Sequence, residues 1–450
     1  MKLKETISHI KFNSKTLHVF FTMFLVGIIP FHKVMVTYAI TLWIISAIAL
    51  MMTNKNVISH FKIHFGLAIS LLMYLSFVAG VFYSNNMPSA LFDIQVKSSL
   101  FIIPPVIYLL RDFYTKNFKY ILMAFVIANI VAGLVCLLLA CYRSLQFFDG
   151  FLHFNSKLPG IYADLNTKPP SYFAYTYFSV FKHPAYFSMY LVLCVFIVIY
   201  FLRNSLNFIT NASKNKILYI AAIIFLVFII YLLESKAAYV ALLLLCLIYG
   251  ISYVVKKRKW IVGIVMIAVI LIISMIGFKQ NSRFYYINSA FKNKDGFIEA
   301  VQSKNYKVLI DTYGIDRIPI WLISSDIIRD NLLAGVGSGD VSDCLMQKYK
   351  EYKLQTLENN RYNTHNQYLE TFMAIGLIGF LIFLLWLFYP LIRNNSYTKE
   401  GFLVSVFIGI VCLNFLFETA LNTIAGVIFV AFFYSFLLFV PNKISKINKT

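Results

Sequence analysis

The stretch HNQYLETFMAIGLIGFLIFLLWLFYPLI, residues 365–392, joins a polar beginning to a long apolar run. Residues 371–392 contain no charged side chain. A run of roughly 20 apolar residues is the length that an α-helix needs to cross the hydrocarbon core of a membrane. The stretch therefore predicts a transmembrane helix with His365, Asn366 and Glu370 at one end.

Similar apolar runs recur along nearly the whole chain of 450 residues. The composition is 60% hydrophobic and 13% charged, whereas water-soluble proteins average roughly 45–50% apolar and 25% charged residues. We therefore expect an all-α polytopic membrane protein with about 12 transmembrane helices. The predicted spans are 17–31, 34–52, 65–83, 98–110, 118–141, 184–202, 217–233, 237–255, 260–277, 366–392, 401–417 and 422–440.

The formal net charge of +21 is distributed as membrane topology predicts. With the N-terminus in the cytoplasm, the inner loops and tails contain about half of the 40 Lys and Arg residues, and the short outer loops contain few. This asymmetry is the one that the positive-inside rule describes. Both termini are then expected in the cytoplasm, and the basic charge is explained without a nucleic-acid partner.

The connection after the ninth predicted helix is the largest polar segment, with 12 Lys or Arg and 10 Asp or Glu residues in positions 278–364. We expect this segment to form an extracytoplasmic loop domain. Residues 1–277 would contain the first nine transmembrane helices, and residues 365–450 the last three with a cytoplasmic tail.

Within the loop domain, apolar residues recur at helical spacing from Ile318 to Leu332, and Ser324 belongs to the polar face. The pattern predicts an amphipathic helix of about four turns on the membrane surface or over the bundle. Arg317 stands at the N-terminal end, where free backbone N–H groups favour an anion. The alternative is an exposed arginine paired with Asp316.

Two glycine-containing segments bear on packing. The loop AGVGSGD, residues 334–340, follows a predicted helix and lacks Gly-Lys-Ser/Thr, so we interpret it as a tight turn and not as a phosphate-binding loop. Gly376 and Gly379 are expected to let a neighbouring helix approach the tenth span closely.

Three ionisable side chains lie at the outer ends of predicted spans. His365 can take up a proton near neutral pH, although a histidine at a helix end is more often structural. Lys236, in the turn between the seventh and eighth spans, could equally extend to the lipid headgroups. For His183, before the sixth span, the structural interpretation is favoured.

The chain resembles the bacterial O-antigen ligase and O-antigen polymerase superfamily. The resemblance rests on His365-Asn366, nine intervening residues and then Gly376-Leu377-Ile378-Gly379, with Arg317 and the large polar loop ahead of them. It implies twelve spans with both ends inside, in a bacterial inner membrane. Where the superfamily usually has Ser-Arg, this chain has Ser235-Lys236, and lysine keeps the charge but not the bidentate fork.

The resemblance implies transfer of a glycan from undecaprenyl diphosphate to a hydroxyl acceptor, by inversion and on the periplasmic side. His365 would be the general base, and Arg317 and Lys236 would bind the diphosphate. Asn366, Glu370 and His183 are candidates for supporting roles. No cofactor or metal ion is expected. The partners would be the lipid-linked donor, a lipid A core or glycan acceptor, and the bilayer.

Several functions remain open on sequence alone. The spacing from His-Asn to Gly-x-x-Gly favours a ligase, with an O-antigen or exopolysaccharide polymerase next and a protein O-oligosaccharyltransferase third. A transporter or lipid-glycan flippase is the rival from a different class. A transporter would place ionisable residues near the membrane midplane, whereas the predicted spans here are nearly free of charge.

Overall fold

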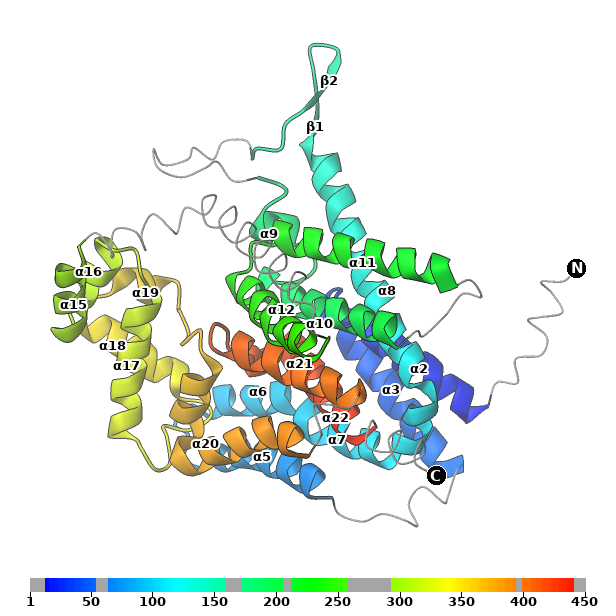
Figure 1. Cartoon of the computed structure of the whole chain (residues 1–450). Coiled ribbons are helices and arrows are strands. Elements are labelled where there is room, and N and C mark those ends of the chain that lie inside the picture. The colour runs from blue at the N-terminus through cyan, green and yellow to red at the C-terminus, as the bar shows by residue number, and fades with distance from the viewer. Residues whose placement is uncertain are drawn as a thin grey trace, which may run out of the picture.

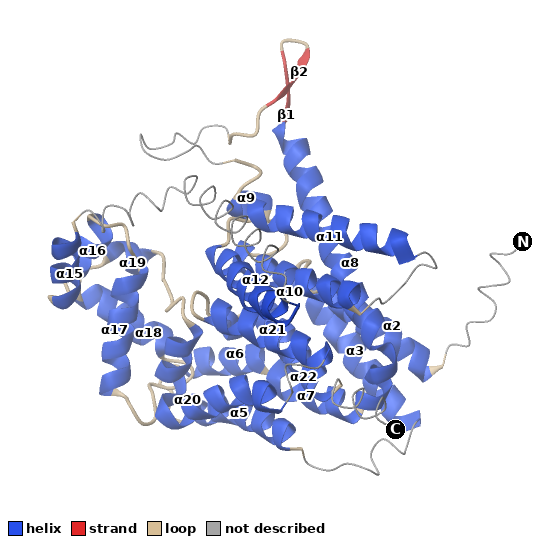
Figure 2. Cartoon of the chain, in the orientation of Figure 1, coloured by secondary structure: helices blue, strands red, loops and turns tan. Residues whose placement is uncertain are grey.

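The computed structural model describes residues 13–53, 64–158, 171–204, 212–257, 293–393 and 399–440, which form a mostly helical protein (Figure 2). The bundle helices are α2 (Ser14–Ile28), α3 (Lys33–Thr53), α5 (Phe65–Val81), α6 (Met87–Lys97), α7 (Ser99–Leu109), α8 (Arg111–Ser144), α9 (Tyr175–Phe178), α10 (Pro184–Arg203), α11 (Ala212–Leu232), α12 (Lys236–Lys257), α20 (Gln367–Arg393), α21 (Lys399–Phe415), η1 (Ala420–Asn422) and α22 (Ile424–Phe439). The remaining helices are α15 (Lys294–Gln302), α16 (Tyr306–Asp311), α17 (Arg317–Asp330), α18 (Val341–Glu351) and α19 (Gln355–Asn359).

The apolar helices form one bundle, and α15 to α19 gather at one side of it (Figure 1). Strands β1 (Leu145–Phe148) and β2 (Phe151–Phe154) pair antiparallel in a hairpin that projects beyond the end of α8 (Figure 1). This arrangement places the small polar helices next to the start of α20.

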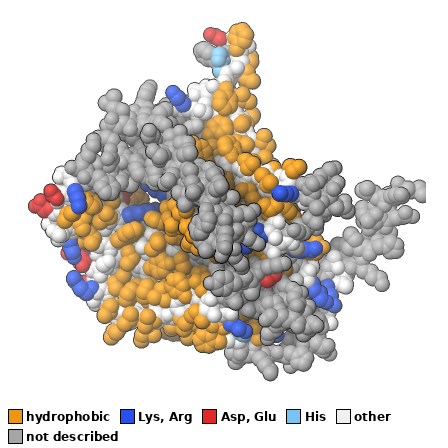
Figure 3. Space-filling view, in the orientation of Figure 1, with side chains coloured by type: hydrophobic (Ala, Val, Ile, Leu, Met, Phe, Trp, Pro, Cys, Tyr) orange, Lys and Arg blue, Asp and Glu red, His pale blue; other side chains and the backbone are white. Residues whose placement is uncertain are grey.

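Six described helices are long and apolar enough to cross a membrane, and five shorter helices are also apolar. Each coincides with a predicted span, and the predicted span at 260–277 lies outside the described residues. Nearly all side chains of α10 and α22 are buried, so these helices form the centre of the bundle. Hydrophobic side chains cover the outer face over α5 and α20, as contact with lipid requires (Figure 3).

The structure extends the fourth predicted span, 98–110, toward the N-terminus. Helices α6 and α7 together give an apolar segment from Met87 to Leu109. Asp93 and Lys97 interrupt the apolar sequence, but they form an ion pair one helical turn apart. The Lys97 ammonium also lies 4.7 Å from the centre of the Phe77 ring. The two charges therefore compensate each other inside the bundle.

The predicted amphipathic helix is present as α17, but its buried stripe is rotated. Ile320, Ile323 and Ile327 face the core. Ser324, expected on the polar face, is fully buried, and its hydroxyl is satisfied by donating to the Ile320 carbonyl at 2.7 Å. Leu332 lies beyond the end of the helix and is 47% exposed. The six buried positions of α17 form one helix face through their i, i+3 and i+4 spacing.

The expectation that Gly376 admits a neighbouring helix is wrong. Gly376 breaks α20, with φ of 62° and ψ of −166°, and the backbone of the glycine loop occupies the break. Val336 N–H donates to the Met373 carbonyl at 2.8 Å, and Leu377 N–H donates to the Leu332 carbonyl at 2.9 Å. The loop that we interpreted as a tight turn is therefore a docking segment that satisfies the backbone groups freed by the break.

The same loop continues onto α5 and α6. Ser338 donates its hydroxyl to the Phe77 carbonyl at 2.7 Å. The Asp340 carboxylate accepts the backbone N–H groups of Asn85 and Asn86, each at 2.7 Å. The Ser338 and Asp340 side chains thus tie the loop domain to the backbone of α5 and of the turn before α6.

We expect Gly376→Ala to destabilise the protein. Its φ and ψ belong to a region used almost only by glycine, where another residue costs about 1–3 kcal/mol, and a Cβ atom would collide with the backbone of Leu333 and Ala334. The thermal unfolding midpoint of detergent-purified protein measures the effect. Gly27→Ala is the matched control, because its Cβ would lie 3.9 Å from the Ala128 side chain, an ordinary contact. Equal midpoints for both variants would contradict the role of the break.

Candidate functional site

The polar site lies where three turns and one helix start meet. Arg317 is the first residue of α17, His365 precedes α20, His183 precedes α10, and Glu418 lies between α21 and η1. These elements are far apart in the sequence. The helices that follow or precede these residues pack against one another, so the residues at their ends come together.

Glu418 is the acidic centre of the site. Its Oε1 lies 3.6 Å from Arg317 Nη2, and its Oε2 lies 3.8 Å from His365 Nδ1. Both distances allow an ion pair but exceed hydrogen-bond length. The Glu418 side chain is only 14% exposed, while those of Arg317 and His365 are 34% and 30% exposed. A ligand can therefore reach the imidazole and the guanidinium more easily than the carboxylate between them.

The backbone at His365 adopts the left-handed conformation, with φ of 45°. Histidine visits this region more often than most residues do, and the Asn363 side chain supports the turn by accepting the His365 N–H at 2.9 Å. The Tyr362 ring packs edge-on against the imidazole, with centroids 5.7 Å apart. Nδ1 is buried without a hydrogen-bond partner among the described residues. The ring is thus held with Nδ1 toward Glu418.

His183 belongs to the same electrostatic neighbourhood. Loss of hydration lowers the pKa of its imidazole below the usual value, Glu418 raises the pKa, and His365 and Arg317 lower it. The hydroxyl of Tyr175 lies 3.5 Å from His183 Nε2. Because the net shift is downward, His183 is mainly uncharged at neutral pH and can accept or donate a hydrogen bond at the edge of the site.

Lys236 is exposed at the first residue of α12. Helix α12 packs against α10, which follows His183, and against α21, which precedes Glu418. Arg317 and His365 both contact Glu418, and His183 is near enough for these three groups to shift its pKa. Lys236, by contrast, is placed by the packing of its helix.

Asn366 and Glu370 support the site from the first turn of α20. The Asn366 side chain caps α20 by accepting the N–H groups of Tyr368 and Leu369 at 2.9 and 3.2 Å. Glu370 accepts hydrogen bonds from the Thr364 hydroxyl and the Asn422 amide, both at 2.7 Å. These contacts hold the residues on both sides of His365.

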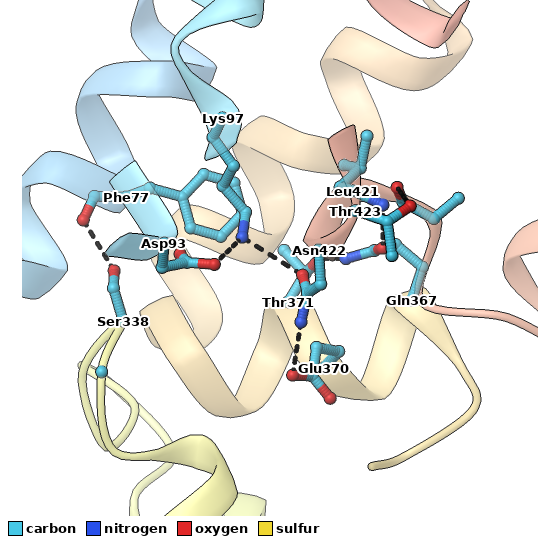
Figure 4. A network of polar contacts seen from close by, with 12 residues as sticks. Phe77, Asp93, Lys97, Ser338, Gln367, Glu370, Thr371, Leu421, Asn422 and Thr423 are labelled. Atoms are coloured by element: carbon cyan, nitrogen blue, oxygen red, sulfur yellow. Dashed lines mark hydrogen bonds and ion pairs between the residues drawn. The ribbon is translucent and has the colours of Figure 1, made fainter. Parts of the chain in front are cut away.

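The Glu370 contacts belong to a larger buried network (Figure 4). The Asn422 side chain donates to Glu370 and accepts from the Lys97 ammonium at 3.1 Å. Lys97 pairs with Asp93 on the same helix. The network therefore links α6, α20 and the turn at η1, and every charge in it has an opposite charge or hydrogen-bond partner nearby, as burial demands.

Sequence reasoning missed Glu418. It is the one charged residue in the short connection between the predicted spans 401–417 and 422–440. An ionisable residue at the end of a membrane span is a functional candidate by default, so this signal was available. Among the described residues, no group of three or more His, Cys, Asp or Glu side chains is placed to hold a metal ion.

The apolar bundle with a polar site at the ends of its helices defines a helical integral membrane protein. Residues 221–384 match the family model described as O-antigen ligase. No curated protein matches the chain in sequence. The matched segment covers 164 of the 450 residues. Arg317, His365 and Lys236 all lie within the matched range.

We expect Glu370→Ala to destabilise the fold, because the Thr364 hydroxyl and the Asn422 amide lose their acceptor. An unsatisfied buried donor costs about 1–3 kcal/mol. Denaturant unfolding in detergent micelles measures the loss. Glu351→Ala is the matched control: this exposed residue pairs with Lys348 at 3.0 Å, so its removal should change stability by less than about 0.5 kcal/mol. A wild-type midpoint for Glu370→Ala would show that the network contributes nothing.

Proposed function

We propose that this protein transfers a glycan from undecaprenyl diphosphate to a hydroxyl of the lipid A core, on the periplasmic side of the inner membrane, as an O-antigen ligase. The observation that carries the proposal is the meeting of Arg317 and His365 at one carboxylate, at 3.6 and 3.8 Å. Glycan transfer from a diphosphate carrier needs a cation for the leaving group and a base for the acceptor, and the proximity of Arg317 and His365 to one carboxylate supports these two roles.

In the proposed reaction, Nε2 of His365 removes the proton from the acceptor hydroxyl. The acceptor oxygen forms a bond to the anomeric carbon as the bond from that carbon to the diphosphate oxygen breaks. The lipid diphosphate leaves with the electron pair, and the proton passes from the imidazole to solvent. No side chain attacks the sugar, so the anomeric configuration inverts in a single displacement.

Arg317 stabilises the negative charge that develops on the leaving diphosphate. Its guanidinium can donate two parallel hydrogen bonds to phosphate oxygens, and its position at the N-terminus of α17 adds the favourable end of the helix dipole. Lys236 supplies a second positive charge to the same leaving group. His183, Asn366 and Glu370 orient and enclose these groups.

The acceptor can be identified in a deletion strain by the band pattern of surface polysaccharide. For a ligase, we expect intact polymer to accumulate on undecaprenyl diphosphate while the lipid A core carries no polymer. If the core instead carries single repeat units, the protein is a polymerase and the proposed acceptor is wrong. Complementation with the wild-type sequence restores the original pattern in either case.

We expect His365→Ala and His365→Gln to lower transfer by roughly 10²- to 10⁴-fold, the usual contribution of a general base, with donor binding retained. Glutamine can form hydrogen bonds but cannot take the proton. A purified assay with a carrier-linked donor measures turnover, and His153→Gln, in the exposed strand β2, is the matched control. An active His365→Gln enzyme would show that the base lies elsewhere.

A further inference from the structure

The carboxylate of Glu418 contacts two groups to which the proposed function gives different tasks. Its two oxygens are divided between them, with Oε1 toward Arg317 at 3.6 Å and Oε2 toward His365 at 3.8 Å. Neither contact has the length of a direct hydrogen bond. One negative charge is therefore shared between the cation for the leaving group and the base for the acceptor.

A side-chain hydrogen bond ties the turn at His365 to the turn at Glu418. The Asn363 side chain donates to the Thr419 hydroxyl at 3.0 Å and accepts from the His365 N–H at 2.9 Å. Glu418 N–H donates to the Asn414 carbonyl at 2.9 Å. The turn that contains His365 and the turn that contains Glu418 are thus joined through Asn363 and Thr419.

We propose that Glu418 is a positioning residue that couples donor binding to activation of the base. This inference rests on the proposed function. In the free enzyme, Arg317 and His365 compete for its carboxylate. The diphosphate of the donor draws Arg317 away, and Glu418 then holds His365 through its Nδ1–H. Donor binding thereby orients Nε2 toward the acceptor hydroxyl.

Charge explains the exchange of partners. A diphosphate has more than one negative charge and presents the paired oxygens that a guanidinium binds best, so it competes well with a single carboxylate. Once Arg317 turns to the donor, Glu418 is a largely buried carboxylate that has lost its arginine partner. An uncompensated buried charge is costly, so the carboxylate closes on His365, a movement of about 1 Å to reach hydrogen-bond length.

The hydrogen bond between Glu418 and His365 also selects the tautomer of the imidazole. An imidazole with its Nδ1 proton donated to a carboxylate has its lone pair on Nε2, which is the atom that must accept the acceptor's proton. Before the donor binds, Arg317 neutralises Glu418 and this selection is weak. The arrangement delays activation of a nucleophile until the donor is in place.

The test uses Glu418→Gln in the purified full-length enzyme, because glutamine keeps the shape and removes the charge. We expect kcat to fall roughly 10-fold or more, while inorganic pyrophosphate, used as a competitive inhibitor, binds as tightly as before or several-fold more tightly because Arg317 no longer has a competing carboxylate. Glu400→Gln, at the opposite end of α21, is the matched control and should retain wild-type values. An unchanged kcat, or weaker pyrophosphate binding at wild-type thermal stability, overturns the proposal.

The acid limb of the pH profile gives a second readout. Among the described residues, Glu418, Arg317, His183 and Tyr362 surround the His365 ring. Removing the Glu418 charge makes the imidazolium less stable, so the acid limb of Glu418→Gln should move to lower pH. A purely structural glutamate would leave the limb in place, and that outcome also contradicts the proposal.

A double variant separates this inference from the proposed function. If His365 is the base and Glu418 acts through it, adding Glu418→Gln to His365→Gln should cause no further loss of kcat. Multiplicative losses would mean that Glu418 acts independently of His365, which overturns the inference alone. An active His365→Gln enzyme would instead overturn the proposed base, and with it this role of Glu418.

Discussion

The backbone of residues 332–337 lies directly against the break in α20 at Gly376, and the position of the whole polar site depends on this contact. The segment leads out of α17, which begins with Arg317, while α20 begins just after His365. Hydrogen bonds from Val336 and Leu377 across the break fix the two helices relative to each other. A side chain on Gly376 would collide with the backbone of this segment, so Arg317 and His365 would no longer face the same carboxylate.

Lipid imposes the second condition, that polar groups near the membrane must satisfy each other. The buried network meets it by alternating donors and acceptors from Asp93 through Lys97 and Asn422 to Glu370. The contact between Lys97 and Asn422 joins residues 325 positions apart. The network supports the turn before α20, where His365 has a left-handed backbone conformation.

Glu418 holds Arg317 loosely before any substrate is present, because the two side chains lie 3.6 Å apart and a third of the Arg317 side chain is exposed. Arg317, and His365 when protonated, share the single charge of Glu418, and a Coulomb interaction at this distance is modest where solvent enters. Such a surface suits an anionic ligand that brings more charge than the carboxylate offers. A lipid diphosphate has this property, which connects the geometry of the site with the family to which the chain is matched.

The sequence by itself determined the apolar helices, the existence of α17 and the candidate roles of His365 and Arg317, because hydropathy and short motifs are local properties. It did not determine the rotated face of α17, where Ser324 is buried, since helix periodicity says which residues share a face but not which face meets a neighbour. The break at Gly376 and the place of Glu418 were decided only by tertiary structure. Both depend on partners distant in the chain, and no spacing within one segment encodes such a contact.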